Sequence, residues 1–115
     1  MKEKLMAQDK LRFDLIHPVM LEDLAYVFTI GAKKHGANNW LQKPIPHSEQ
    51  VAALYRHLIA YLKGEVRASD DGQLHLGSIA WRAGTLAVYD RLGIGVNDLP
   101  INIEQAKLAI RKELG

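Results

Sequence analysis

The segment 64–72 collects the side chains with the clearest capacity for chemistry. It holds Glu65, Asp70 and Asp71 between two glycines, at which the backbone turns freely. Three carboxylates that lie close together can bind Mg²⁺ or Mn²⁺, which are hard cations that prefer oxygen ligands. The same residues also suit a solvated acidic turn, because Asp-Asp-Gly is ordinary turn chemistry. The segment is therefore a candidate metal site with a simple structural alternative.

Two histidines and one arginine flank this segment. His57 precedes it and His75 follows it, each within a stretch of helical periodicity. Either could take part in chemistry, although a single histidine is more often structural or exposed. Arg82 is the one charged residue between positions 76 and 89, and an unpaired guanidinium in an apolar helix is costly. We expect it to meet either a bound phosphate or one of three carboxylates: Asp23, Glu65 or Asp90.

A second set of polar residues lies in and near the segment 33–40. Lys34 precedes an amide-rich loop that contains Asn39 and Trp40, and the N-terminal arm adds Arg12 as a further cation. Such a composition suits a nucleotide, with the cations on phosphates and the ring against a base. It also describes an ordinary exposed loop. Neither of the standard glycine-rich phosphate-binding loops occurs in the sequence.

Four predicted helices must position these side chains. Pro18 suits the first turn of the first helix, and Ser48 is a natural N-cap for the second. Asn102, with Gln105 three residues on, predicts a capped start for the last one. Hydrophobic periodicity and these signals place the four helices at residues 18–35, 48–63, 75–91 and 101–114.

The 75–91 stretch is apolar on more than one side. Ile79 and Leu86 share one face, whereas Trp81 and Val88 share another. A helix that is apolar all round is buried, and a chain of 115 residues needs a second subunit to cover such a helix. No alternating β-branched run competes with the helices. The sequence predicts an all-α bundle of about four helices, one domain over residues 1–115, whose core is completed in a homodimer or homotetramer.

The composition excludes several classes of protein. Hydrophobic residues make up 48% and charged residues 24%, a balance typical of a globular domain rather than a disordered chain. The absence of cysteine excludes disulfides and thiolate chemistry. A formal charge of +2 disfavours nucleic acid as the main partner. Without an apolar stretch long enough to cross a bilayer or a signal peptide, we expect a cytoplasmic protein with no membrane partner.

Read in order, several short motifs resemble the small phage and prophage proteins known as dATP/dGTP diphosphohydrolase domains. These are distant relatives of the all-α MazG-like nucleotide pyrophosphohydrolases. The resemblance covers residues 10–90 and leaves residues 101–114 outside it. It is carried by these motifs: Arg12-Phe13-Asp14-Leu15-Ile16-x-Pro18, Gly31-Ala32-Lys33-Lys34-His35-Gly36, Asn39-Trp40, Arg56-His57-Leu58-x-Ala60-Tyr61-x-x-Gly64-Glu65, Asp70-x-Gly72-x-x-His75-Leu76 and Ala80-Trp81.

The resemblance implies a phage-linked enzyme with a MazG-like fold. It implies that a (deoxy)nucleoside triphosphate, with a purine base, is hydrolysed to a monophosphate and pyrophosphate with Mg²⁺ or Mn²⁺. The implied metal ligands are Glu65, Asp70 and Asp71. The residues expected to bind substrate are Arg12, Lys34, Arg56 and Arg82 on the phosphates, and Asn39 and Trp40 on the base or sugar. The expected catalytic residues, which would orient the attacking water, are His57, His75 and Glu65.

Two other functions remain open at this point. The Glu-x-x-Glu and Glu-x-x-Asp patterns of MazG-like enzymes do not occur, and Ala68, Ser78 and Arg82 replace residues common in the family. These departures favour a non-catalytic helical module that binds a nucleotide or a protein. The basic stretch 107–112 gives some support to a nucleic-acid-binding helical dimer, for which steep salt dependence would be the signature.

Overall fold

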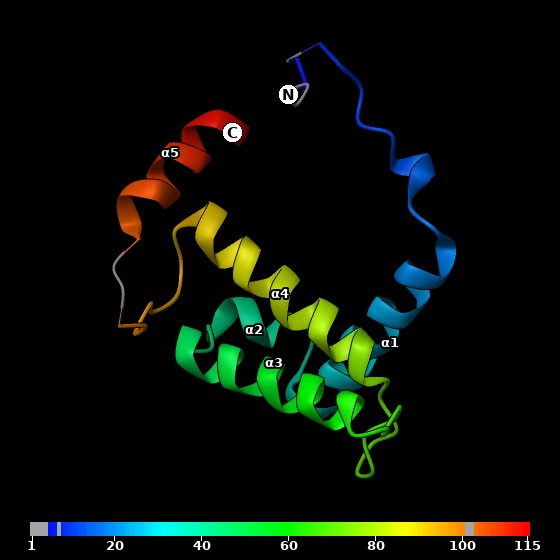
Figure 1. Cartoon of the computed structure of the whole chain (residues 1–115). Coiled ribbons are helices and arrows are strands. Elements are labelled where there is room, and N and C mark those ends of the chain that lie inside the picture. The colour runs from blue at the N-terminus through cyan, green and yellow to red at the C-terminus, as the bar shows by residue number, and fades with distance from the viewer. Residues whose placement is uncertain (1–4, 7, 101–102) are drawn as a thin grey trace.

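The computed structural model describes residues 5–6, 8–100 and 103–115, and helices are its regular elements (Figure 1). Within that part of the chain no β-strand forms, and a single isolated bridge pairs Arg67 with Leu74. The all-α prediction is therefore confirmed. The elements are a 3-10 turn at Phe13–Leu15, α1 at Pro18–His35, α2 at Asn39–Gln42, α3 at His47–Leu62, α4 at His75–Leu92 and α5 at Glu104–Leu114.

Local signals define α1 at both of its ends. The ring Nδ1 of His17 accepts a hydrogen bond from the backbone N–H of Val19 at 3.1 Å, and Pro18 opens the first turn. Gly36 ends the helix with a φ of 93°, a conformation that suits glycine. The prediction of a helix over 18–35 is confirmed, and its last turn places Lys34 and His35 beside the loop that follows.

The start of α3 differs from the prediction. The helix begins at His47 after Pro46, so Ser48 is not its N-cap. Instead, Asp98 accepts hydrogen bonds from the Ser48 backbone N–H at 2.8 Å and from its hydroxyl at 2.5 Å. The hydrogen bond from the Ser48 hydroxyl, and to a smaller extent the one from its backbone N–H, lowers the pKa of Asp98. A distant carboxylate thus supplies the negative charge that a helix N-terminus favours, and the serine becomes a donor.

Helix α4 packs against α1, α3 and α5 (Figure 1). Its buried positions carry small or polar residues, among them Gly77, where a Cβ atom would lie 3.3 Å from the Asp23 carbonyl oxygen of α1. In the single chain Leu76 and Leu92 are 50% and 63% exposed, so burial of this helix on all sides by a second subunit stays a prediction. Other apolar side chains of α4 do meet neighbours within the chain, since Tyr89 is fully buried and Trp81 packs against Phe28 and Trp40.

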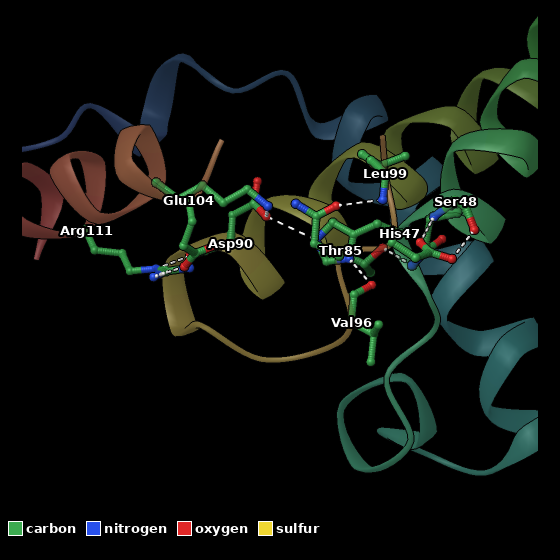
Figure 2. Close-up of polar contacts among 12 residues, drawn as sticks. His47, Ser48, Thr85, Asp90, Val96, Leu99, Glu104 and Arg111 are labelled. Atoms are coloured by element: carbon green, nitrogen blue, oxygen red, sulfur yellow. Dashed lines mark hydrogen bonds and ion pairs between the residues drawn. The ribbon is translucent and has the colours of Figure 1, made fainter. Parts of the chain in front are cut away.

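The C-terminal helix α5 is held against α4 by polar contacts, shown in Figure 2. The Lys107 ammonium lies 2.7 Å from Asp90 Oδ1, and its side chain is 7% exposed. The same carboxylate oxygen is 3.2 Å from His47 Nε2 of α3. Arg111 pairs with Glu104 at 3.0 Å and donates to the Asp90 carbonyl. The predicted cap Asn102 lies outside the described residues, and Ile103 directly precedes the helix.

We expect Asp90→Ala to loosen α5 selectively. The substitution leaves the Lys107 ammonium buried without its carboxylate, at a cost of about 2 kcal/mol, less than for a fully buried pair because Asp90 is 37% exposed. Amide hydrogen exchange in α5 should become roughly 30-fold faster, whereas exchange in α1 changes little. Glu113→Ala, at an exposed position of α5, is the control. Unchanged exchange in α5 of the Asp90 variant would contradict this account.

None of the helices in the described part of the chain combines the length and the apolar character that a membrane span requires.

Candidate active site

Two adjoining cavities lie between α1, α4 and the loops that follow α1 and α3. Their volumes are about 370 and 270 Å³. We call the larger one the aromatic pocket, because Phe28, Trp40 and Trp81 line it, and the smaller one the polar pocket, because Lys34 and Arg82 line it. Together they form one cleft, since they share four lining residues: Gly31, His35, Ile45 and Trp81.

Three rings that pack on one another form a wall of the aromatic pocket. The ring centroid of Phe28 is 6.0 Å from those of Trp40 and Trp81, and the two indoles are 6.3 Å apart. Trp40 belongs to α2, a one-turn helix that follows Asn38 in a left-handed conformation. Such a set of rings offers a stacking surface for a planar base.

Tyr89 of α4 fixes the backbone that carries this pocket. Its side chain is fully buried, and its hydroxyl donates to the Trp40 carbonyl oxygen at 2.6 Å. The same hydroxyl accepts from the Ile45 backbone N–H at 3.1 Å. Since Trp40 and Ile45 both line the aromatic pocket, one side chain of the core holds two points of its wall.

Trp81 stands at the junction of the two pockets with an unused donor. Its indole Nε1–H is buried and meets no hydrogen-bond acceptor among the described residues. A buried donor without a partner costs about 1 to 3 kcal/mol. Trp81 lines both pockets, but its Nε1 atom has almost no exposed surface, so a ligand would reach it only if a neighbouring side chain moved.

Arg82 is half-buried in the polar pocket and pairs with no carboxylate among the described residues. Its guanidinium donates to the amide oxygen of Gln50 at 2.7 Å and lies 5.0 Å from the Trp81 ring centroid. Burial, followed by the nearby Arg56, lowers the pKa of Arg82. Of the two alternatives for Arg82, the ion pair with Asp23, Glu65 or Asp90 is absent, and the groups that contact the guanidinium are a neutral amide and an aromatic ring.

The other cation of the polar pocket is paired. Lys34 Nζ lies 2.6 Å from Asp71 Oδ2, and this contact raises the pKa of the lysine. Burial opposes ionisation of Asp71, but the hydrogen bonds from Lys34 and Gln73 lower its pKa overall. The bridge joins α1 to the 63–74 loop and fixes one wall of the pocket.

A chain of hydrogen bonds leads from the polar pocket to the surface. His57 lines the pocket, and its Nδ1 lies 2.9 Å from Nδ1 of the buried His75. His75 Nε2 lies 2.7 Å from Glu65 Oε1, and the Glu65 side chain is about half exposed. The pKa of His57 is lowered by burial first, and then by the nearby His75, Arg82 and Arg56.

The structure gathers most of the predicted site residues and separates the rest. Those that line the cleft are Lys34, Asn39, Trp40, His57, Asp70, Asp71 and Arg82. His75 and Glu65 stand behind His57. Arg56 and Glu65 line a separate hollow, and Arg12 pairs with Asp14 at 2.8 Å on the exposed N-terminal arm.

The three predicted metal ligands do not converge. No three His, Cys, Asp or Glu side chains of the described chain are close enough together to hold a metal ion. Glu65 is engaged by His75 outside the cleft, and both Asp71 oxygens accept protein donors. Asp70 uses one oxygen for the Asp71 backbone N–H at 2.9 Å, and its other oxygen meets no donor among the described residues. Such a set suits Mg²⁺ that arrives on phosphate oxygens and gains one carboxylate.

Sequence reasoning missed two residues of this site. Gln50 is fully buried and holds Arg82 through its oxygen, while its amide group donates to the Thr85 hydroxyl at 2.9 Å. A polar residue one position before the apolar stripe of α3 was the available signal. Trp81 was expected in the core, whereas its indole N–H proves to be an unpaired donor at the junction of the pockets.

Comparison with known proteins identifies the family. No curated protein and no solved structure matches the chain significantly. The family model described as dATP/dGTP diphosphohydrolase, N-terminal, matches residues 2–99, and this description indicates hydrolysis of nucleoside triphosphates. The match covers most of the chain, including every residue of the cleft. The chain therefore belongs to the dATP/dGTP diphosphohydrolase family.

Proposed function

We propose that this protein hydrolyses a purine (deoxy)nucleoside triphosphate to a monophosphate and pyrophosphate in the cleft between α1 and α4. The observation that carries the proposal is Arg82, a half-buried guanidinium whose hydrogen-bond partner is a neutral amide and which adjoins the aromatic pocket. An anion is the partner that this group lacks, and triphosphate oxygens would supply it.

The two pockets divide the nucleotide between them. The base lies against the cluster of Phe28, Trp40 and Trp81, whose apolar surface favours the larger ring system of a purine. The triphosphate lies in the polar pocket against Arg82 and Lys34.

We further propose that Mg²⁺, or Mn²⁺, enters bound to the triphosphate and that Asp70 provides its protein carboxylate. Asp70 lines the polar pocket and has one oxygen that no donor of the described residues meets, which supports this assignment. When bound, the metal neutralises phosphate charge and polarises the phosphorus that is attacked. The protein itself contributes the cations Arg82 and Lys34. Both are held in place, and they stabilise the negative charge that develops on the phosphate oxygens.

The test is pyrophosphate release from a panel of common ribo- and deoxyribonucleoside triphosphates, with Mg²⁺, with Mn²⁺ and with a chelator. We expect release from the purine deoxynucleotides and loss of turnover in the chelator. Asp70→Asn should raise the metal concentration for half-maximal rate about tenfold, whereas Asp9→Asn on the N-terminal arm should not. Nucleotide binding without turnover would instead favour a non-catalytic binding module.

We propose that the protein is a homo-oligomer, because the single chain exposes more surface than its mass requires. Its accessible area is 8892 Å² at 12.9 kDa, compared with about 6,300 Å² for a typical monomer of this mass. Large apolar side chains are exposed on α1, α3 and α4, including Met20, Leu62 and Leu76. Light scattering after gel filtration should give at least twice the chain mass, and a monomer at micromolar concentration would refute this.

A further inference from the structure

Resting on the proposed function, we infer that His57 is the catalytic base for the attacking water and that His75 and Glu65 position it. The inference comes from the hydrogen-bond chain Glu65–His75–His57, which joins a half-exposed carboxylate to a wall of the polar pocket. Two hydrogen bonds join these three side chains, and each bond needs one donor and one acceptor. The ionisation state of Glu65 therefore determines where the protons lie on both histidines.

The carboxylate fixes the direction of the chain. An ionised Glu65 can only accept, so His75 must carry its proton on Nε2, which lies 2.7 Å from Oε1. In the neutral ring Nδ1 of His75 is then an acceptor. The contact of 2.9 Å between the two Nδ1 atoms needs one donor, which must be His57. A neutral His57 with its proton on Nδ1 has a bare Nε2.

Nε2 is the ring nitrogen of His57 that is not engaged by His75. His57 lines the polar pocket, whereas His75, which holds Nδ1, does not. His57 Nε2 meets no hydrogen-bond partner among the described residues. We assign it to the polar pocket, which His57 lines together with Arg82 and Lys34, the cations proposed to hold the triphosphate. A base in this position needs one water between its lone pair and a phosphorus atom.

The same chain can accept the proton that the attacking water releases. His57 Nε2 takes a proton from water, the oxygen forms a bond to the α-phosphorus, and pyrophosphate leaves with the electron pair of the broken P–O bond. The Nδ1 proton of His57 shifts to His75 Nδ1, so the positive charge comes to lie beside the Glu65 carboxylate, which stays ionised. After pyrophosphate departs, the proton returns to His57 Nδ1 and the Nε2 proton passes to solvent water.

The environment of His57 agrees with this role. Burial, followed by His75, Arg82 and Arg56, lowers the pKa of His57, and the smaller effect of Asp71 opposes them. The ring is therefore neutral at physiological pH with its lone pair available. The turnover number should fall in acid solution, once His57 becomes protonated, and stay level above its pKa.

Nitrogen-15 NMR of the histidine rings tests the chain without any substrate. In the free wild-type protein at neutral pH, we expect His57 protonated on Nδ1 and His75 protonated on Nε2. Glu65→Gln should mix the two tautomers of His75 and, through it, those of His57. A His57 ring that carries its proton on Nε2 in the wild-type protein would overturn the inference, because no base would then face the pocket.

Kinetics supply the second measurement. His57→Gln should lower kcat by about a hundredfold to ten-thousandfold, while nucleotide affinity, followed by tryptophan fluorescence, changes less than about threefold. Glu65→Gln should lower kcat about tenfold with little effect on KM. His17→Gln, at the exposed start of α1, is the matched control and should retain activity.

The possible results distinguish the role of His57 from the proposed function on which it rests. Wild-type hydrolysis that persists unchanged in His57→Gln would overturn the role of His57 and leave the proposed function intact. A wild-type protein that binds nucleotides and hydrolyses none of them would overturn the proposed function, and with it the need for a base.

Discussion

Arg82→Gln is expected to lower kcat/KM for triphosphate hydrolysis by about a hundredfold to a thousandfold, or roughly 3 to 4 kcal/mol of transition-state stabilisation. Arg82 is held in place by Gln50 and the Trp81 ring, so it meets the phosphates already oriented. Glutamine keeps a donor of shorter reach but removes the charge. Because this charge is half-buried, solvent screens it less than it screens a surface lysine.

The comparison that isolates this effect is Arg91→Gln. Arg91 belongs to the same helix but is exposed at its C-terminal end, so the same change of charge should leave kcat/KM within about twofold. Thermal unfolding of both variants controls for the hydrogen bond that Gln50 loses. A folded Arg82 variant with wild-type kcat/KM would remove the principal support for phosphate binding in the polar pocket.

The long helices could be predicted from the sequence because their signals are local. Pro18 and Gly36 bound α1 through their own backbone preferences, and the structure confirms both. The start of α3 could not be predicted in this way, because Asp98 reaches Ser48 from fifty residues along the chain. Likewise, the hydrophobicity of α4 indicates how much apolar surface it carries but not which neighbours cover it.

For the candidate site, too, the sequence predicts residue types but not their long-range partners. Lys34, Trp40 and Arg82 have residue types that suit a nucleotide, and the fold brings them to one cleft. Their partners follow from contacts that no spacing encodes. Asp71 pairs with Lys34 across 37 positions, and Gln50 meets Arg82 across 32. The sequence could therefore indicate which residue types suit a ligand, whereas the three-dimensional packing decides which charges already have a partner within the chain.

Tyr89→Phe should be the most destabilising conservative change in the chain, at about 3 kcal/mol. It removes only one oxygen, but that oxygen donates to the Trp40 carbonyl and accepts from the Ile45 N–H. With Tyr89 fully buried, both backbone groups would lose their partner in a place that water enters poorly. The unfolding midpoint should fall by roughly 10 to 20 °C, as measured by calorimetry.

The same substitution should also weaken nucleotide binding, because the hydroxyl holds two points of the aromatic pocket. KM should rise about tenfold with a smaller change in kcat, since the polar pocket and its cations are left in place. Tyr55→Phe, at an exposed position of α3, is the control and should shift stability by less than about 0.5 kcal/mol. If stability fell but KM stayed constant, the base would have to bind elsewhere, since a loosened wall around Trp40 cannot leave stacking on that ring unaffected.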